Sequence, residues 1–411
     1  MAIIIAFIAM TIPVLGFGLT LVYFNQYRRV LISALLCGLA FSAAFYGYIS
    51  DEGNDIFRHM ANMELYADVS LWDAFNLLKN DASHISSVYT WDLWLWIMSK
   101  FDNPLLLQSS GAFVGYSLIS YFVFDFAKTH KWQFKHWGLV LFVALALISP
   151  LSIAIGIRNA NAFLICAMAL YQYYFKKKSV ILAFSLLLMA LFLHHSVIVI
   201  LGVWFIIPFI ARFKWISIGL TILFLFLFRN YESYLYLLTG GSSGPGGLVA
   251  NTLYSASAYQ NDLFNTSVHA IVSLLWGIGV SAFLIWHSKH TLRYLETTQQ
   301  STYLINNKRL YNMAFFIFAI SVAMLPILGN NASRFFIPAN ILSLFIMMQN
   351  PDEFILINKN KVRLYPLLLY LAASGNILLY FYNMNWGTAS LKSFFLSSLL
   401  GYFTNIITNV M

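Results

Sequence analysis

Long apolar runs alternate with short polar segments along the whole chain. A membrane-spanning helix needs about 20 apolar residues, because the hydrocarbon core of a bilayer is about 30 Å thick. The pattern therefore predicts an all-α, polytopic transmembrane helical bundle of about 12–13 spans. The expected spans are 3–24, 30–50, 105–127, 137–156, 159–175, 179–193, 197–211, 215–229, 267–287, 310–329, 335–349 and 364–384. Segment 393–411 is expected to form either a further span or a helix in the outer interface.

The basic residues predict which side of the membrane each connection faces. Most of the 24 Lys and Arg lie in alternate connections between the predicted spans. They are Arg28, Arg29, Lys128, Lys131, Lys135, Lys176, Lys177, Lys178, Arg212, Lys214, Lys289, Arg293, Lys308, Arg309, Lys359, Lys361 and Arg363. Because cytoplasmic loops are enriched in Lys and Arg, these connections are expected to be cytoplasmic. The chain, 1–411, is then one integral membrane domain with two long periplasmic loops, 51–104 and 230–266.

The first outer loop contains an apolar run, 89–101, that does not fit a single crossing, because both ends of the loop lie on the same side. Trp91, Trp94 and Met98 recur at helical spacing, whereas Asp92 interrupts the run. We therefore expect an amphipathic helix at the outer interface, or a re-entrant segment.

The composition excludes a soluble globular protein, since 60% of the residues are hydrophobic and only 9% are charged. Met1–Met10 has no basic segment before its apolar run, so we expect a first span rather than a cleaved signal peptide. Cys37 and Cys166 fall in predicted spans, which argues against a disulfide or a cysteine metal site. The net charge of +9 resides in the loops and does not indicate nucleic acid. The Gly-rich stretch 240–247 lacks the Gly-Lys-Ser/Thr of a phosphate-binding loop.

Four arginines fall outside the predicted cytoplasmic connections, namely Arg58, Arg158, Arg229 and Arg334. A guanidinium presents a planar set of donors that can bind two phosphate oxygens at once. Apolar sequence flanks Arg158 and Arg334 on both sides, so we expect them to bind an anionic, lipid-linked substrate at the outer face. Arg229, at the end of a predicted span, fits a lipid headgroup contact better and is a weaker substrate-binding candidate.

His194 and His195 lie in a short turn between two predicted spans, at the outer face. A neutral imidazole can take a proton from a sugar hydroxyl near neutral pH. Adjacent residues on a helix point about 100° apart, so the pair does not have metal-ligand spacing. The alternative is a pair of interfacial histidines that bond to backbone groups at a helix end.

The stretch from Asp51 to His59 is rich in acids and ends with Arg58 and His59. Carboxylates such as Glu52 and Asp55 can bind sugar hydroxyls or act as a general base. The alternative is a solvated acidic loop in which Asn54 or Asp55 caps a helix.

In content and in order, these segments resemble the O-antigen polymerase (Wzy) and EpsG-like family of bacterial polysaccharide polymerases. Asp55–His59 is similar to the family's Asp-x-Tyr-Arg-His stretch in the first outer loop, with Phe57 in place of the usual Tyr. Ile157–Arg158, with Ala162 four residues after the arginine, is similar to the family's Ile-Arg-x-x-x-Ala helix start.

Two later segments extend the resemblance. His194–Ser196 is similar to the family's His-x-Ser turn, which leaves His195 as an extra histidine. Arg334–Phe336 is similar to its late outer arginine. The likeness runs from about residue 45 to about residue 345, and its motifs are short.

The resemblance implies a glycosyltransferase that polymerises lipid-linked repeat units. A growing glycan on undecaprenyl pyrophosphate would pass to a sugar hydroxyl of an incoming unit, and the lipid pyrophosphate would leave. No cofactor, metal or nucleotide sugar is expected. The implied partners are the undecaprenyl-pyrophosphate-linked glycan, the lipid bilayer, a chain-length regulator and a flippase. The implied location is the bacterial inner membrane, with the active site facing the periplasm.

The candidate residues then divide into two groups. Arg158 and Arg334 would neutralise the pyrophosphate as charge develops in the transition state. His194, or a carboxylate such as Asp55, would take the proton from the acceptor hydroxyl. The expected substrate-binding residues are Glu52, Arg58, His59, His195 and Arg229.

Three other functions stay open. A lipid-linked oligosaccharide flippase would need polar residues through the middle of several spans, whereas here they gather near one face, and such transporters often have two similar halves. An O-antigen ligase would use similar chemistry, although the 230–266 loop is short for docking a bulky acceptor. A membrane acyltransferase would also use a histidine, but no motif beyond His194 supports it.

Overall fold

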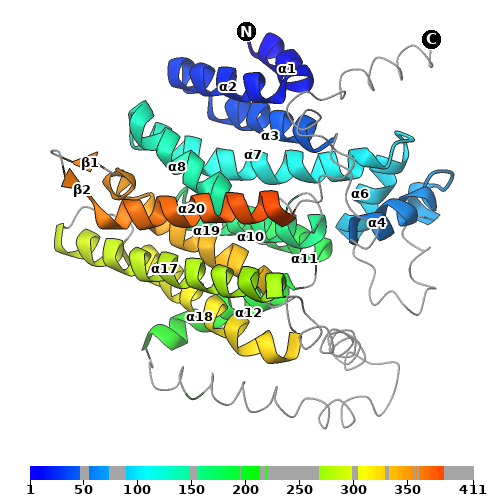
Figure 1. Ribbon diagram of the computed structural model, residues 1–411. Coiled ribbons are helices and arrows are strands. Elements are labelled where there is room, and N and C mark those ends of the chain that lie inside the picture. Colours follow the sequence, from blue (N-terminus) through cyan, green and yellow to red (C-terminus); the bar gives the residue numbers. More distant parts are fainter. Residues whose placement is uncertain are drawn as a thin grey trace.

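The structure is a bundle of α-helices, as the apolar pattern predicts (Figure 1). The computed structural model describes residues 1–46, 55–73, 89–148, 153, 156–194, 196–212, 219, 268–298, 304–328, 333–355, 357–358 and 361–383. The predicted segments 230–266 and 393–411, and the predicted span 215–229 apart from Gly219, lie outside these residues.

The helices of the described part follow most of the predicted spans. They are α1 (Ala2–Thr11), α2 (Pro13–Tyr27), α3 (Val30–Tyr46), α4 (Asp55–Glu64), α6 (Tyr89–Ser99), α7 (Leu105–Thr129), α8 (Phe134–Leu147), α10 (Ile157–Tyr174), α11 (Val180–Leu193), α12 (Val197–Arg212), α17 (Val268–Thr298), α18 (Leu304–Leu328), α19 (Phe336–Met347) and α20 (Leu364–Asn383). A short 3-10 helix, η2 (Pro351–Phe354), precedes two antiparallel two-residue strands, β1 (Ile357–Asn358) and β2 (Lys361–Val362).

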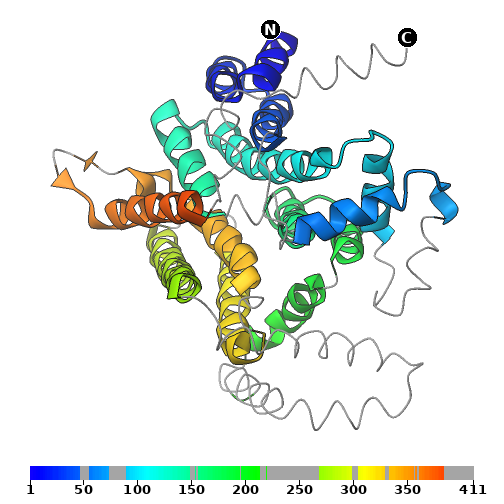
Figure 2. The same ribbon diagram turned by 45° about the vertical axis from the view of Figure 1, so that its right-hand side comes forward.

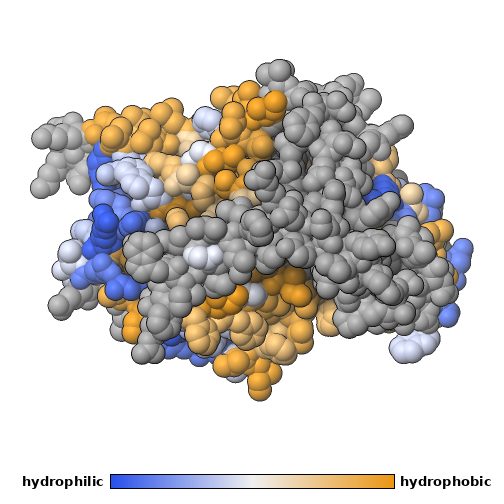
Figure 3. All heavy atoms as spheres, turned by 90° about the horizontal axis from the view of Figure 1, so that it is seen from below, coloured by the Kyte–Doolittle hydropathy of each residue, from blue (hydrophilic) through white to orange (hydrophobic). Residues whose placement is uncertain are grey.

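Within the described residues, three helical segments are long and apolar enough to cross a membrane: Leu105–Thr129, Ile271–Thr298 and Leu304–Leu325. The other apolar helices are shorter. Figure 3 shows hydrophilic residues at the two ends of one face and hydrophobic residues between them. An apolar band between polar ends is the surface that a bilayer requires, so the structure supports a membrane-associated protein.

The predicted span 3–24 is wrong as a single helix. The chain breaks at Ile12, whose backbone has φ −132° and ψ 80°, and α2 starts at Pro13. Proline has no N–H for a continuing helix, and it pushes the residue before it towards extended conformations. Helices α1 and α2 instead fold against each other, where Ala9 lies against Gly16, and both pack on α3 at one edge of the bundle (Figure 2).

Helix α7 is the centre of the first half of the chain, with α3 on one side and α10 on another. Small residues bring these helices close, as in many membrane bundles. A Cβ added at Gly38 of α3 would lie 1.9 Å from Ser117 Oγ of α7, and one added at Gly111 would lie 2.3 Å from Ile157 Cγ1. The second contact places the first turn of α10, which contains Arg158, against α7.

The basic connections gather at one end of the bundle. Arg28 donates to Trp132 O across 2.7 Å, which joins the α2–α3 turn to the α7–α8 turn. Lys176, after α10, pairs with Asp125 near the end of α7 at 2.6 Å. His136 of α8 lies 3.6 Å from Asp352 of η2. Helices α4 and α6 lie at the opposite end (Figure 1).

Candidate functional site

Helix α6 confirms that the run 89–101 is helical over Tyr89–Ser99, whereas its predicted position at the membrane interface stays a prediction. Its neighbours hold it at the end of the bundle. Trp94 Nε1 donates to Ser110 Oγ of α7 across 2.8 Å, and Lys100 Nζ donates to Ala67 O, after α4, across 2.7 Å. At 11 residues, α6 is about 16 Å long, too short to cross a bilayer core of about 30 Å. Its buried face includes Trp91 and Leu95.

Trp91 joins two of the predicted site residues. Its ring packs against that of His59 of α4 in a T-shaped arrangement, with ring centroids 4.9 Å apart and planes at 70°. The guanidinium carbon of Arg158 lies over the same ring, 5.6 Å from its centroid. An arginine over a desolvated indole gains a cation–π attraction, and Trp91 is only 2% exposed. The structure thus brings α4, α6 and α10 to one place.

Arg158 is half-buried in the first turn of α10. Its neighbours Ile157 and Asn159 are buried, so this turn is held firmly while the arginine reaches towards α6. The first backbone N–H groups of a helix have no acceptor within the helix, and they add positive potential at this end. The arrangement favours a negatively charged ligand.

Asp92 is a member of this group that the sequence pattern did not single out. Its side chain is fully buried, and Tyr66 OH donates to its Oδ1 across 3.4 Å. Burial raises the pKa of Asp92 to about 6, although the Tyr66 hydrogen bond and the charge of Arg158 oppose the shift. The only signal in the sequence was a carboxylate directly after Trp91 in an apolar run.

His194 ends α11 in an extended conformation and is 9% exposed. Its Nδ1 lies 2.7 Å from Ser196 Oγ and accepts a bond from Ser196 N across 3.1 Å. Ser196 Oγ also reaches Asn159 Oδ1 at 3.4 Å. The predicted His-x-Ser turn is therefore bonded to the residue next to Arg158, a link that spacing in the sequence did not reveal.

The remaining candidates have more peripheral positions, or lie outside the described residues. Arg58 of α4 is exposed. Arg334 is also exposed and directly precedes Phe335, whose ring packs 5.4 Å from that of Phe163 in α10. Asp55 is the first residue of α4, and its side chain is outside the described part, as are Glu52, His195 and Arg229.

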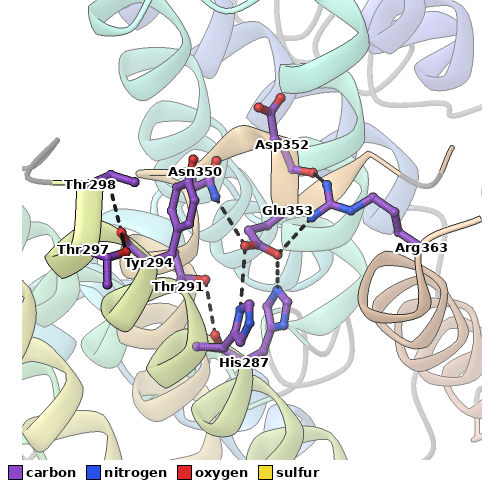
Figure 4. A network of polar contacts seen from close by, with 10 residues as sticks. His287, Thr291, Tyr294, Thr297, Thr298, Asn350, Asp352, Glu353 and Arg363 are labelled. Atoms are coloured by element: carbon purple, nitrogen blue, oxygen red, sulfur yellow. Dashed lines mark hydrogen bonds and ion pairs between the residues drawn. The ribbon is translucent and has the colours of Figure 1, made fainter. Parts of the chain in front are cut away.

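Figure 4 shows a second polar cluster, around η2. The strands β1 and β2, which follow η2 in the chain, lie at the end of the bundle opposite to α4 and α6 (Figure 1). Glu353 of η2 is 2% exposed, and His287 Nε2 of α17 lies 3.4 Å from its Oε2. Arg363, before α20, lies 3.7 Å from the same oxygen, and Asn350 donates to Oε1 across 3.3 Å. Burial raises the pKa of Glu353, and Arg363 opposes the shift. These contacts join three elements, which indicates a structural role.

The group around Trp91 can bind an anion through Arg158 and can exchange a proton through Asp92. No group of three or more His, Cys, Asp or Glu with a metal-binding arrangement occurs among the described residues. Neither a family model, nor a curated protein, nor a solved structure matches this chain.

Proposed function

We propose that this protein joins undecaprenyl-pyrophosphate-linked oligosaccharide repeat units at the outer face of a bacterial inner membrane, as a polysaccharide polymerase. One observation carries the proposal: Arg158 lies over Trp91, the residue before the buried Asp92, and its neighbour Asn159 is linked through Ser196 to His194. An arginine next to a proton-exchanging carboxylate suits a transfer in which a pyrophosphate leaves and a hydroxyl attacks.

The location of the group supports a lipid-linked substrate. It lies at the end of the bundle opposite to the basic connections, which is the outer end if those connections are cytoplasmic. A lipid-linked glycan in the outer leaflet would reach this end by lateral diffusion. The undecaprenyl chain would stay in the bilayer while its pyrophosphate meets Arg158.

In the proposed reaction, Arg158 binds the pyrophosphate and balances the charge that develops as the bond to the sugar breaks. Arg334, on the segment that packs against α10, assists from the exposed side. His59 and Arg58 of α4 orient the sugars. Each of these roles requires the side chain to act near Trp91, which Arg158 of α10 and His59 of α4 both contact.

A flippase and a ligase remain the competing functions. A flippase moves the lipid-linked glycan without cleaving it, whereas a ligase transfers the finished glycan to a different lipid. The two polar clusters described above lie at opposite ends of the bundle and not in its middle, which favours transfer over transport. A polymerase and a ligase differ in the acceptor that receives the glycan. Only a reaction with defined acceptors can therefore distinguish these two functions.

The test uses purified full-length protein and lipid-linked repeat units extracted from a strain of the source bacterium that lacks this protein. We expect a glycan ladder from the wild type and release of undecaprenyl pyrophosphate. Arg158→Ala should give single units only, whereas Arg29→Ala, an exposed arginine at the basic end, should give a normal ladder. A ladder of normal length from Arg158→Ala would contradict the proposal, and so would an inactive, folded wild type.

A further inference from the structure

The proposed transfer needs a group that takes the proton of the acceptor hydroxyl, and the hydrogen bonds of His194 argue against its imidazole. Ser196 N–H donates to His194 Nδ1 across 3.1 Å. In a neutral imidazole, the nitrogen that accepts such a bond carries no hydrogen, so Nε2 carries it. Nε2 is then a donor suited to a phosphate oxygen, and it has no lone pair for a hydroxyl proton.

Asp92 has the free lone pair that the neutral His194 lacks. Its carboxylate is fully buried on α6, directly after Trp91, and it senses the charge of Arg158. Tyr66 OH donates to Oδ1 at 3.4 Å, which is long for a bond between oxygens. Among the residues that the structure describes, none donates a hydrogen bond to Oδ2. A buried carboxylate oxygen without a donor is costly, and a ligand hydroxyl would relieve that cost.

We propose that Asp92 is the catalytic base of the transfer, with Oδ2 taking the proton of the acceptor sugar hydroxyl while His194 Nε2–H and Arg158 bind the leaving pyrophosphate. The inference rests on the proposed function and assigns its proton transfer to one side chain. The Tyr66 hydroxyl bonds Oδ1, so Oδ2, to which none of the described residues donates, is the oxygen that meets the acceptor hydroxyl.

The step balances without any further reactant. A bond forms between the acceptor oxygen and the anomeric carbon of the growing glycan. The bond between that carbon and the pyrophosphate oxygen breaks, and its electron pair leaves with the lipid pyrophosphate. The acceptor proton passes to Asp92 Oδ2 and is later lost to water, which restores the carboxylate for the next unit.

The surroundings of Asp92 support its role as a base near neutral pH. Two titratable groups act on Asp92: the Tyr66 hydroxyl, which donates to Oδ1, and Arg158 of α10, whose charge opposes the rise in pKa. His59 of α4 packs on the neighbouring Trp91, and His194 ends α11, which packs on α6. Helix α7 meets α6 through the Ser110 hydroxyl. With the pKa of Asp92 near 6, the base is ionised at neutral pH yet still basic enough to take a proton.

Variants of the two candidate bases separate the roles. Asp92→Asn keeps the shape but removes the base, so polymerisation should fall by about 100-fold or more. Asp68→Asn, an exposed carboxylate after α4, is the matched control and should leave the rate unchanged. If Asp92 is the base, the rate falls at low pH as its carboxylate is protonated. His194→Gln retains an N–H donor near the position of Nε2 but is not a base, so its pH–rate profile should keep this fall at low pH. If His194→Gln loses this fall while Asp92→Asn keeps it, His194 is the base and the inference fails.

A reaction with azide distinguishes a base from a residue that only supports the structure. Azide attacks the anomeric carbon without losing a proton, so it needs no base. In Asp92→Ala, we expect azide to give a glycosyl azide and free undecaprenyl pyrophosphate, while polymerisation stays absent. Loss of both products from a protein that unfolds at the wild-type temperature would overturn the inference. A wild type that makes no ladder and no glycosyl azide would instead refute the proposed function itself.

Discussion

The guanidinium of Arg158 lies over the indole of Trp91, with Cζ 5.6 Å from the ring centroid, although α10 and α6 are far apart in the sequence. Trp91 directly precedes Asp92 in α6, and the charge of Arg158 opposes the rise that burial causes in the pKa of Asp92. The same indole meets His59 from α4. A single aromatic side chain therefore contacts candidate site residues from two other helices, Arg158 of α10 and His59 of α4.

Trp91→Ala tests this arrangement. Trp91 is 2% exposed, so its removal should destabilise the protein by about 3–5 kcal/mol through a cavity and lost packing. Trp72→Ala, at a tryptophan that is 75% exposed, should cost far less. Thermal unfolding in detergent measures both. Equal losses in the two variants would show that Trp91 does not anchor the end of α10.

The raised pKa of Asp92 predicts an unusual dependence of stability on pH. The pKa of this carboxyl is about 6 in the folded protein, whereas that of an unburied aspartate is 3.8. The folded state therefore binds the proton more tightly than the unfolded state does. The contribution of this group to stability is complete below about pH 4 and is lost as the pH rises through about 6.

Asp92→Asn should remove this loss of stability at neutral pH, because an amide does not ionise. At pH 7 the variant should therefore be more stable than the wild type, by on the order of 2 kcal/mol, even though it is inactive in the proposed reaction. Below about pH 4 the two proteins should have similar unfolding temperatures. Measurement of those temperatures on both sides of the folded-state pKa checks the sign, and a variant that is less stable at neutral pH would refute it.

The cluster around Glu353 should contribute to stability and not to the proposed chemistry. Glu353→Ala removes the side chain that contacts His287, Asn350 and Arg363 in a buried setting, and we expect a loss of about 3 kcal/mol. Glu296→Ala removes an exposed pair with Lys308 and should cost less than about 1 kcal/mol. Activity per folded molecule should be unchanged in both. A selective loss of activity in Glu353→Ala would assign this cluster a functional role.

Gly38 tests how closely α3 and α7 must approach. A Cβ there would lie 1.9 Å from Ser117 Oγ and 2.6 Å from Phe113 O, so Gly38→Ala should force the helices apart and cost about 1–3 kcal/mol. Gly18→Ala of α2 meets nothing within 4 Å and should be neutral, or stabilising by up to about 1 kcal/mol. Unfolding temperatures of both variants give the comparison. Equal stability of Gly38→Ala and the wild type would contradict the tight packing.

Most elements of the fold could be predicted from the sequence, because apolar periodicity and length are local properties. Helices α7, α10, α11 and α18 lie close to their predicted ranges. The error at 3–24 arose because hydropathy alone does not register the break that Pro13 imposes. The membrane side of each end, and the roles of all the candidate site residues, stay predictions.

The amino-acid sequence by itself determined that the protein is a membrane-associated helical bundle and that arginines and histidines occur at its predicted outer turns. Helices from distant parts of the chain meet to form the site. Their packing decides whether a carboxylate is buried, which atom bonds to an imidazole nitrogen, and which aromatic face lies beneath a guanidinium. Only the tertiary structure could therefore select Asp92 and link Arg158 to His194. The physical reason is that pKa and hydrogen bonding respond to neighbours in space, whereas sequence patterns report neighbours along the chain.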